Sequence, residues 1–170
     1  MRRLTDPVLV EMPAQQMAVV HTKGDPNQVA QSAIKALYSA VYGLKMGRRK
    51  HGGGEDFRVG LLRARWPDLH VVPKPEWTAH WALPIPEDAQ SLPTKPGLPP
   101  VEIERWEYGL VAQVLHLGSY DAEQETIQRL HEFINAQGCE IAGVHEEEYL
   151  TRPDAKQPKT IIRYPVRRVG

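Results

Sequence analysis

Two short stretches of the sequence share the same order of residue types. The first is AVVHTKGDPNQ at residues 18–28, and the second is QVLHLGSYDAEQ at residues 113–124. Each is an apolar run with a histidine, followed by glycine, an Asp-x-x-Gln group and apolar residues at helical spacing. Each half also ends in a similar apolar segment with proline, ALPI at 82–85 and RYPV at 163–166. This pattern predicts an internal duplication with the order strand, helix, strand, strand.

The spacing of apolar residues predicts where the elements lie. In the first half we expect strands at 16–23, 57–66 and 77–85, a helix at 25–45 and a loop at 46–56. In the second half we expect strands at 101–117, 140–150 and 160–166, and a helix at 121–137. Asp25 and Asp121 are the expected helix N-caps, because a carboxylate at that position accepts hydrogen bonds from free backbone N–H groups.

This order predicts a fold of the α+β class in a single domain of residues 1–170. The first repeat covers about 16–86, a proline-rich linker about 87–100, and the second repeat about 101–166. We expect two strand-helix-strand-strand (SHS2) modules related by a pseudo-twofold axis. Their antiparallel sheet would carry the helices on one face. A ligand cleft would lie between the repeats, a common place for a small-molecule site.

Composition excludes several classes of protein. No apolar run is long enough to cross a bilayer, and no motif of a nucleic-acid-binding module is present. Cys139 is the only cysteine, so an internal disulfide and a thiolate-based zinc site within one chain are both excluded. A single thiol favours a reducing, cytoplasmic location. We predict neither membrane nor nucleic-acid partners, and no dissociable cofactor.

The formal net charge is zero, but the charges are unevenly distributed. Residues 1–75 contain 12 Lys and Arg against 6 Asp and Glu, whereas residues 76–170 contain 9 against 15. The acidic half therefore favours a cationic or neutral ligand over a phosphate-rich one.

The acidic half includes HEEEYLTRP at residues 145–153, which sets carboxylates in a run that otherwise indicates a strand. Because side chains alternate along a strand, Glu147 and Tyr149 share one face with His145, and Glu146 and Glu148 take the other. One interpretation is a solvated edge strand, since charges protect sheet edges. The other is the floor of a pocket, with a carboxylate beside a phenol on a rigid support.

Aromatic residues are the next candidates for a binding site. The chain has four tryptophans and only two phenylalanines, and an amphipathic ring suits a partly wet pocket wall. The alternative is that these rings fill the core. The candidates are Trp66, Trp77, Trp81, Tyr108, Tyr38 and Tyr42.

The histidines do not form a recognisable metal motif, and we predict no metal site. The pair His145-Glu146 lacks the second histidine of His-Glu-x-x-His and lies in a predicted strand. His21 and His116 occupy matching positions in the two repeats, which argues for a structural role. Ser39, Ser119 and Thr160 do not lie in a Ser/His/Asp sequence pattern, so we do not expect a serine hydrolase.

The doubled pattern, HEEEYLTRP and the closing KTIIRYPV are similar to the GyrI-like small-molecule-binding family. This family shares its fold with the effector-binding domain of some bacterial transcription activators. The segments YGLKM, RARWPD and EWTAHWALPIP further resemble a stand-alone branch of the family. The resemblance extends from about residue 17 to residue 166.

The resemblance implies a cleft between the repeats that binds small, often aromatic or cationic, organic molecules. The family's central glutamate falls on Glu147, two residues before the motif tyrosine, Tyr149. In some stand-alone members such a glutamate acts in the hydrolysis of strained cyclopropane-bearing natural products. Other members bind drugs, or bind and inhibit DNA gyrase. Since no DNA-binding domain is attached, we do not expect a transcription factor.

Two hypotheses follow. In the first, the protein is a stand-alone binder of hydrophobic or cationic small molecules, and an ionised Glu147 attracts the ligand. In the second, it is a hydrolase with Glu147 as general base and Tyr149 assisting. Whether it is an enzyme stays open at this point. A topoisomerase-like protein partner is a third option that no residue pattern supports.

Overall fold

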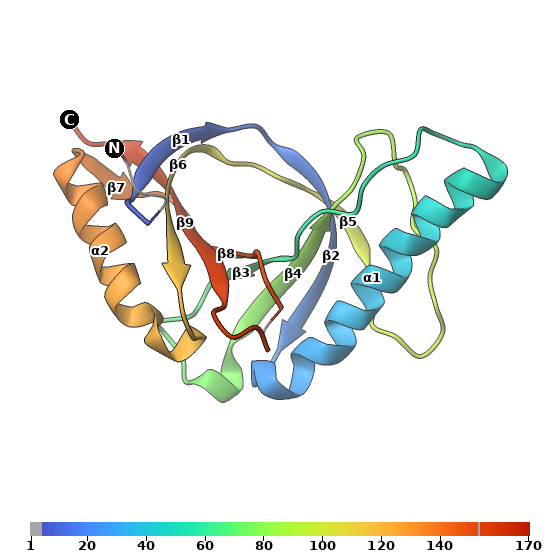
Figure 1. The fold of residues 1–170 in the computed structure, drawn as a ribbon, viewed down its shortest axis with the longest axis horizontal. Coiled ribbons are helices and arrows are strands. Elements are labelled where there is room, and N and C mark those ends of the chain that lie inside the picture. Colours follow the sequence, from blue (N-terminus) through green and yellow to red (C-terminus); the bar gives the residue numbers. More distant parts are fainter. Residues whose placement is uncertain (1–4, 153) are drawn as a thin grey trace. The chain divides into compact units, whose positions relative to one another are not determined.

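The computed structural model describes residues 5–152 and 154–170, so Pro153 of the HEEEYLTRP motif lies outside the described residues. The chain is an α+β protein with antiparallel strands and two α-helices across these residues (Figure 1). It divides into two compact units. The first, named the Tyr108–Gly170 unit, also includes the residues up to Pro13. The second is the Ala14–Glu107 unit.

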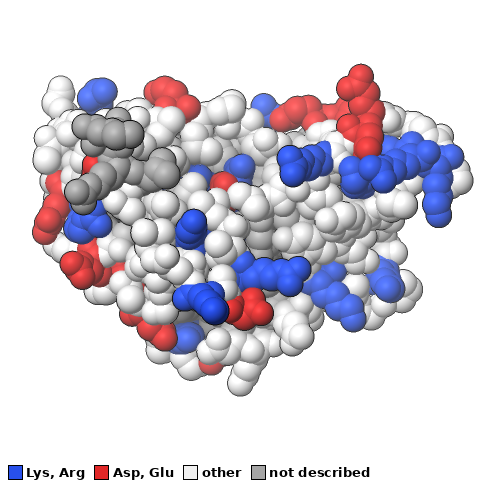
Figure 2. Space-filling view, in the orientation of Figure 1, with Lys and Arg blue, Asp and Glu red and all other residues white. Residues whose placement is uncertain are grey.

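The Ala14–Glu107 unit is a four-stranded antiparallel sheet in the order β3-β4-β2-β5. Helix α1 packs against β2 and β4. The Lys and Arg side chains of its basic last turn gather over the end of the helix in Figure 2. The elements are β2 (Gln15–Lys23), α1 (Pro26–His51), β3 (Arg63–Trp66), the 3-10 helix η1 (Lys74–Glu76), β4 (Thr78–Pro84) and β5 (Glu102–Trp106).

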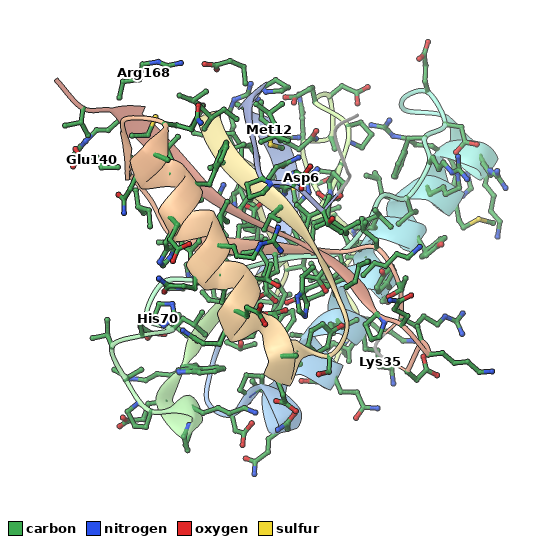
Figure 3. All side chains as sticks on the ribbon, turned by 60° about the vertical axis from the view of Figure 1, so that its left-hand side comes forward. Asp6, Met12, Lys35, His70, Glu140 and Arg168 are labelled. Atoms are coloured by element: carbon green, nitrogen blue, oxygen red, sulfur yellow. The ribbon has the colours of Figure 1, made fainter. Side chains whose placement is uncertain are left out.

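The Tyr108–Gly170 unit contains the order β1-β6-β9-β8, with β7 also pairing with β9. Helix α2 packs against β6 and β7 on one side of these strands (Figure 3). The elements are β1 (Val8–Met12), β6 (Gly109–Leu117), the 3-10 helix η2 (Tyr120–Ala122), α2 (Glu123–Ala136), β7 (Cys139–Ile141), β8 (His145–Tyr149) and β9 (Lys159–Arg168).

The edge strands β1 and β5 are exchanged between the two halves of the sequence. Strand β1 precedes β2 in the chain but pairs with β6, and β5 precedes β6 but pairs with β2. Each unit then has a helix and the same strand order, β5-β2-β4-β3 in one and β1-β6-β9-β8 in the other. The two units are therefore alike in strand order, and the duplication and the single-domain boundaries stay predictions.

The start of α1 follows the sequence prediction, but its end does not. The Asp25 side chain accepts a hydrogen bond from the Asn27 backbone N–H at 2.9 Å, with proline at the first helical position. The helix continues past Lys45 to His51, so the loop predicted from residue 46 is wrong for its first turn and a half. The helix stops only at Gly52, whose φ of 76° is the left-handed conformation that glycine tolerates.

Other boundaries also differ from the prediction. The turn η2 precedes α2, whose N-cap is Ala122 without a side-chain hydrogen bond, so Asp121 does not cap the helix. The strand expected at 101–117 is two strands, because Gly109 has a φ of 70° where the chain leaves one unit for the other. The strand at 140–150 is likewise two, β7 and β8. The strand expected at 57–66 begins only at residue 63, and β1 was not predicted.

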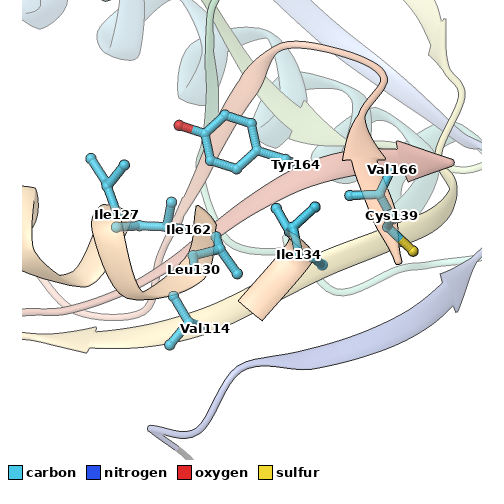
Figure 4. Packing of buried hydrophobic residues seen from close by; sticks show 9 residues of the cluster. Val114, Ile127, Leu130, Ile134, Cys139, Ile162, Tyr164 and Val166 are labelled. Atoms are coloured by element: carbon cyan, nitrogen blue, oxygen red, sulfur yellow. The ribbon is translucent and has the colours of Figure 1, made fainter. Parts of the chain in front are cut away.

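The core of the Tyr108–Gly170 unit lies between α2 and its strands (Figure 4). From the predicted helical stripe, Ile127, Leu130 and Ile134 are buried, and Leu130 is 0% exposed. They pack in one cluster with side chains from β6, β7 and β9, namely Ala112, Val114, Cys139, Ile162, Tyr164 and Val166.

Replacing Leu130 by Ala should lower the free energy of unfolding by about 2–5 kcal/mol, because the change removes buried methyl groups and leaves a cavity. Urea denaturation followed by circular dichroism measures the loss. Leu117→Ala is the matched control, because Leu117 is 41% exposed, and it should cost less than about 1 kcal/mol. Equal losses in the two variants would contradict this placement of the core.

Candidate functional site

Strand β8 is the support of the candidate site. It pairs with β9 in antiparallel register, which fixes the direction of each side chain. His145, Glu146 and Glu147 are 3%, 1% and 7% exposed, so the interpretation of this stretch as a solvated edge strand is wrong. The alternation expected from the sequence holds, since Glu147 is hydrogen-bonded to His145 and Tyr149 on one face.

Both oxygens of Glu147 accept hydrogen bonds. The Tyr149 hydroxyl donates to Oε1 at 3.0 Å, and His145 Nε2 lies 2.7 Å from Oε2. The structure thus brings together the two predicted catalytic residues, Glu147 and Tyr149. Their catalytic role stays a prediction.

His145 is itself held by a second tyrosine. Its Nδ1 lies 2.7 Å from the Tyr164 hydroxyl, on β9. The tautomer consistent with both contacts has Nε2–H donating to Glu147 and Nδ1 accepting from Tyr164. Burial and the nearby carboxyls of Glu147 and Glu123 raise the pKa of Tyr164, so this phenol keeps its proton as the donor.

A second carboxyl, that of Glu123, enters the site from the first turn of α2. Burial, the charge of Glu147 and a hydrogen bond with Glu147 together raise the pKa of Glu123 to about 10. Burial would also raise the pKa of Glu147, but hydrogen bonds from His145, Glu123 and Tyr149 outweigh it and lower that pKa. One carboxyl is therefore protonated and the other ionised. The Glu123 Oε1 atom is buried without a hydrogen-bond partner among the described residues.

Tyr120 completes this group of side chains. Its ring meets that of Tyr149 edge to face, with centroids 5.8 Å apart. Burial and the charge of Glu147 raise the pKa of Tyr120. Sequence reasoning missed Glu123, Tyr120 and Tyr164 as site residues. The first two belong to the stretch interpreted as a helix cap, and Tyr164 was noticed only as part of the repeated RYPV segment.

The same group offers metal ligands. Glu123, His145 and Glu147 place ligand atoms within 4.8 Å of one another, and all three side chains are buried. A nitrogen and carboxylate oxygens are the donor set of many zinc sites. The sequence predicted no metal site because no spacing motif links these residues. In this arrangement, however, the hydrogen bonds among the residues already satisfy their polar atoms apart from Glu123 Oε1.

The opposite face of β8 carries a separate ion-pair network. Arg163 Nη1 donates to Glu146 Oε2 at 2.6 Å, and its Nη2 donates to Glu148 at 3.2 Å. The Tyr108 hydroxyl donates to both oxygens of Glu146, at 2.9 and 3.1 Å. Tyr108, predicted as a ligand-binding residue, therefore contacts Glu146, and its role in ligand binding stays a prediction.

The predicted tryptophans lie together in the Ala14–Glu107 unit. The Trp66 ring meets those of Trp77 and Trp81 edge to face, with centroids 5.8 and 5.2 Å apart. Trp77 donates to the Val72 carbonyl and Trp81 to the Thr22 hydroxyl. Trp66 and Trp81 are only 8% and 5% exposed, which fits the alternative that they fill the core. Their role in binding stays a prediction.

Tyr38 and Tyr42 stack on α1 with ring centroids 6.2 Å apart, and Tyr42 is 48% exposed. The two cavities described in this unit, of about 540 and 240 Å³, are lined by other residues. The larger one lies beside Arg48, Phe57 and Ile85, and the smaller one between α1 and the proline-rich segment. The ligand-binding role of the two tyrosines also stays a prediction.

Comparison with known families decides where the chain belongs. The model of the GyrI-like small molecule binding domain matches residues 5–167. The chain belongs to this family. The resemblance inferred from the motifs is thereby confirmed, and the protein is a small-molecule-binding domain. No helix among the described residues is long and apolar enough to span a membrane.

Solved structures with the same fold include proteins from Listeria innocua. A hydrolase from that organism is 26% identical, with a TM-score of 0.83 over 96% of this chain and 92% of its own. An uncharacterized conserved protein from Listeria innocua is 26% identical, with a TM-score of 0.84 over 96% and 93%. The C-terminal domain of EcmrR, 14% identical with a TM-score of 0.64 over 96% and 98%, shares the fold. No curated protein matches the sequence.

Replacing Glu123 by Gln should make the protein less sensitive to alkali. The folded-state pKa of Glu123 is about 10, against an ordinary value of 4.5. Between these values the folded chain retains a proton that the unfolded chain releases, so the stability of the parent falls as pH rises through this window. The slope from one proton is at most about 1.4 kcal/mol per pH unit. Glutamine carries no such proton.

Urea denaturation between about pH 5 and pH 8 tests this expectation. The stability of Glu123→Gln relative to the parent should increase with pH. Glu125→Gln makes the same change at an exposed position of α2 and should follow the parent. If the Glu123→Gln and parent curves stay parallel, Glu123 is not the protonated member of the pair.

Proposed function

We propose that this GyrI-like domain is a hydrolase of small electrophilic molecules, with Glu147 as its general base. The observation that carries the proposal is the pair of buried carboxyls with opposite pKa shifts, Glu147 below its ordinary value and Glu123 far above. Carboxyls whose environments push their pKa values apart are typical of catalytic sites in which one carboxyl is an ionised base and the other stays protonated as a hydrogen-bond donor. The Listeria innocua relative described as a hydrolase supports the same reaction class.

The hydrogen bonds of Glu147 leave one acceptor position of its carboxylate for a reacting water. A carboxylate has about four lone-pair positions, and Tyr149, His145 and Glu123 occupy three of them. A water donating to the remaining position would lose its proton to Glu147 as its oxygen attacks. Tyr149 and His145 then hold the carboxylate in one orientation, which is the role that partners of a general base commonly have.

The charge of the site limits the substrate. With Glu147 ionised and Glu123 protonated, the pair carries one negative charge, which favours a neutral or cationic molecule over an anion. The family resemblance suggests a strained cyclopropane conjugated to a carbonyl. The water oxygen would form a C–O bond, the strained C–C bond would break, and its electron pair would pass to the carbonyl oxygen, which takes up a proton from solvent. Glu147 later returns the water's proton to solvent.

Sequestration without turnover is the second candidate. The observation in its favour is that Glu147 is held by several donors, as a fixed charge would be, beside the paired rings of Tyr149 and Tyr120. A flat organic cation attracted by the carboxylate could stack against such rings. In this case Glu147 contributes affinity and no chemistry.

Replacing Glu147 by Gln should abolish turnover and leave the fold and ligand binding largely intact. The loss of a general base typically reduces the rate about 10²–10⁴-fold. A screen of strained electrophiles and cationic dyes, with saturable quenching of tryptophan fluorescence for binding and product analysis for turnover, provides the measurement. Glu125→Gln is the matched control and should behave as the parent.

The outcomes separate the two candidates. Product from the parent that disappears in Glu147→Gln, while binding survives, supports the hydrolase. Binding without product in the parent, weakened by Glu147→Gln, would instead make the protein a sequestering module. Turnover by Glu147→Gln at the rate of the parent would remove Glu147 from the mechanism.

The rate of turnover should also fall at both acid and alkaline pH. Turnover should fall on the acid side as Glu147 takes up a proton, at a pH below the ordinary pKa of glutamate, 4.5. It should fall on the alkaline side near pH 10, where Glu123 loses its proton. A pH–rate profile of the parent and Glu123→Gln checks this, because glutamine cannot ionise and should remove the alkaline limb. An alkaline limb that persists unchanged would assign it to another group.

A further inference from the structure

A second group of metal-ligand side chains lies on adjacent strands of the Ala14–Glu107 unit. His21 on β2 and His80 on β4 stand directly opposite each other in the antiparallel register. Their rings meet with centroids 4.4 Å apart at 60°. Residues directly opposite on paired strands point to the same face, so both imidazoles lie on one side of the sheet.

Two carboxylates reach the same histidine from β5, the strand on the other side of β2. Glu104 Oε2 is in direct contact with His21 Nε2, and Glu102 Oε2 lies 3.9 Å from the same nitrogen. The ligand atoms of His21, Glu102 and Glu104 all lie within 4.8 Å of one another. An ordinary ion pair needs one carboxylate, whereas here two converge on one imidazole.

A cationic side chain, that of Arg65, lies on the neighbouring strand of this sheet. Arg65 on β3 stands opposite His80 in the register. Its guanidinium lies over the Trp106 ring at 4.0 Å and donates to the Glu107 carbonyl at 3.2 Å. These contacts hold a positive charge beside the aromatic ring of Trp106.

We propose that His21, Glu102 and Glu104 bind a divalent transition metal ion of the zinc type, with the His80 ring packed against the His21 ring. Imidazole nitrogen combined with carboxylate oxygen suits Zn²⁺, Co²⁺ or Ni²⁺, whereas Ca²⁺ and Mg²⁺ prefer oxygen ligands alone. The strands hold the ligands in place before the ion arrives, which is what a metal site requires of its scaffold. The ion would join β5 to β2. This site shares no residue with the Glu147 group, and the proposal does not depend on the proposed hydrolysis.

Zinc binding to the untagged full chain tests the proposal. In isothermal titration calorimetry with ZnCl₂, the parent should bind one ion. His21→Ala and Glu104→Gln should each weaken binding by more than about tenfold, since even outer-shell partners of metal ligands are worth that much. His51→Ala, which removes an exposed histidine at the end of α1, should bind as the parent does.

Thermal unfolding gives a second measurement. Zinc should raise the melting temperature of the parent and of His51→Ala, because an ion that binds only the folded chain stabilises it. It should not raise that of His21→Ala, whose melting temperature without zinc shows whether the variant folds. A parent that binds no zinc overturns the proposal. Binding that survives His21→Ala and Glu104→Gln but is lost in Glu123→Gln also overturns it, because the metal would then lie at the buried cluster.

Discussion

Two carboxyls buried side by side cannot both be ionised at low energetic cost, and the Glu147 site is arranged around this constraint. The donors aimed at Glu147, from His145 and Tyr149, determine which carboxyl carries the charge. Glu123 keeps its proton as a consequence. The Tyr164 hydroxyl holds the imidazole of His145, and this imidazole in turn holds the carboxylate of Glu147. The side chains that reach Glu147 from β8, β9 and α2 therefore depend on one another for their protonation states.

Strand β8 carries charge on both faces, and β9 neutralises or orients both. Arg163 and Tyr164 are neighbours on β9 and point to opposite faces. Arg163 pairs with Glu146, and Tyr164 holds His145 on the face of Glu147. A buried ion pair seldom adds much stability over apolar packing, but breaking one by removing a single partner is costly. Glu146 and Arg163 stand opposite each other in the register of β8 on β9, so their pairing favours this register and with it the direction in which Glu147 points.

The sequence predicted those parts of the site that depend on local alternation. The pairing of Glu147 with Tyr149 follows from the period of a strand, and the start of α1 follows from Asp25 and the proline after it. Glu123 could not be found this way, because it enters from a helix far away in the sequence and has no motif of its own. The end of α1 was missed because the apolar residues at helical spacing end near residue 44, whereas the mostly polar and basic residues up to His51 are still helical. The break between β5 and β6 depends on Gly109, whose positive φ no pattern of apolar residues reveals.

The exchanged edge strands have a consequence for the synthesis of the protein and for its proteolysis. During synthesis, the Ala14–Glu107 unit lacks its strand β5 until the ribosome has passed Trp106. Strand β1 has been synthesised well before this point, but its partner β6 has not. A protease that cuts in the proline-rich segment would release two fragments, each carrying an edge strand that belongs to the other. Neither fragment alone encodes a complete sheet. The halves of this chain, however similar in pattern, are therefore not interchangeable modules that evolution or an engineer could separate at the linker.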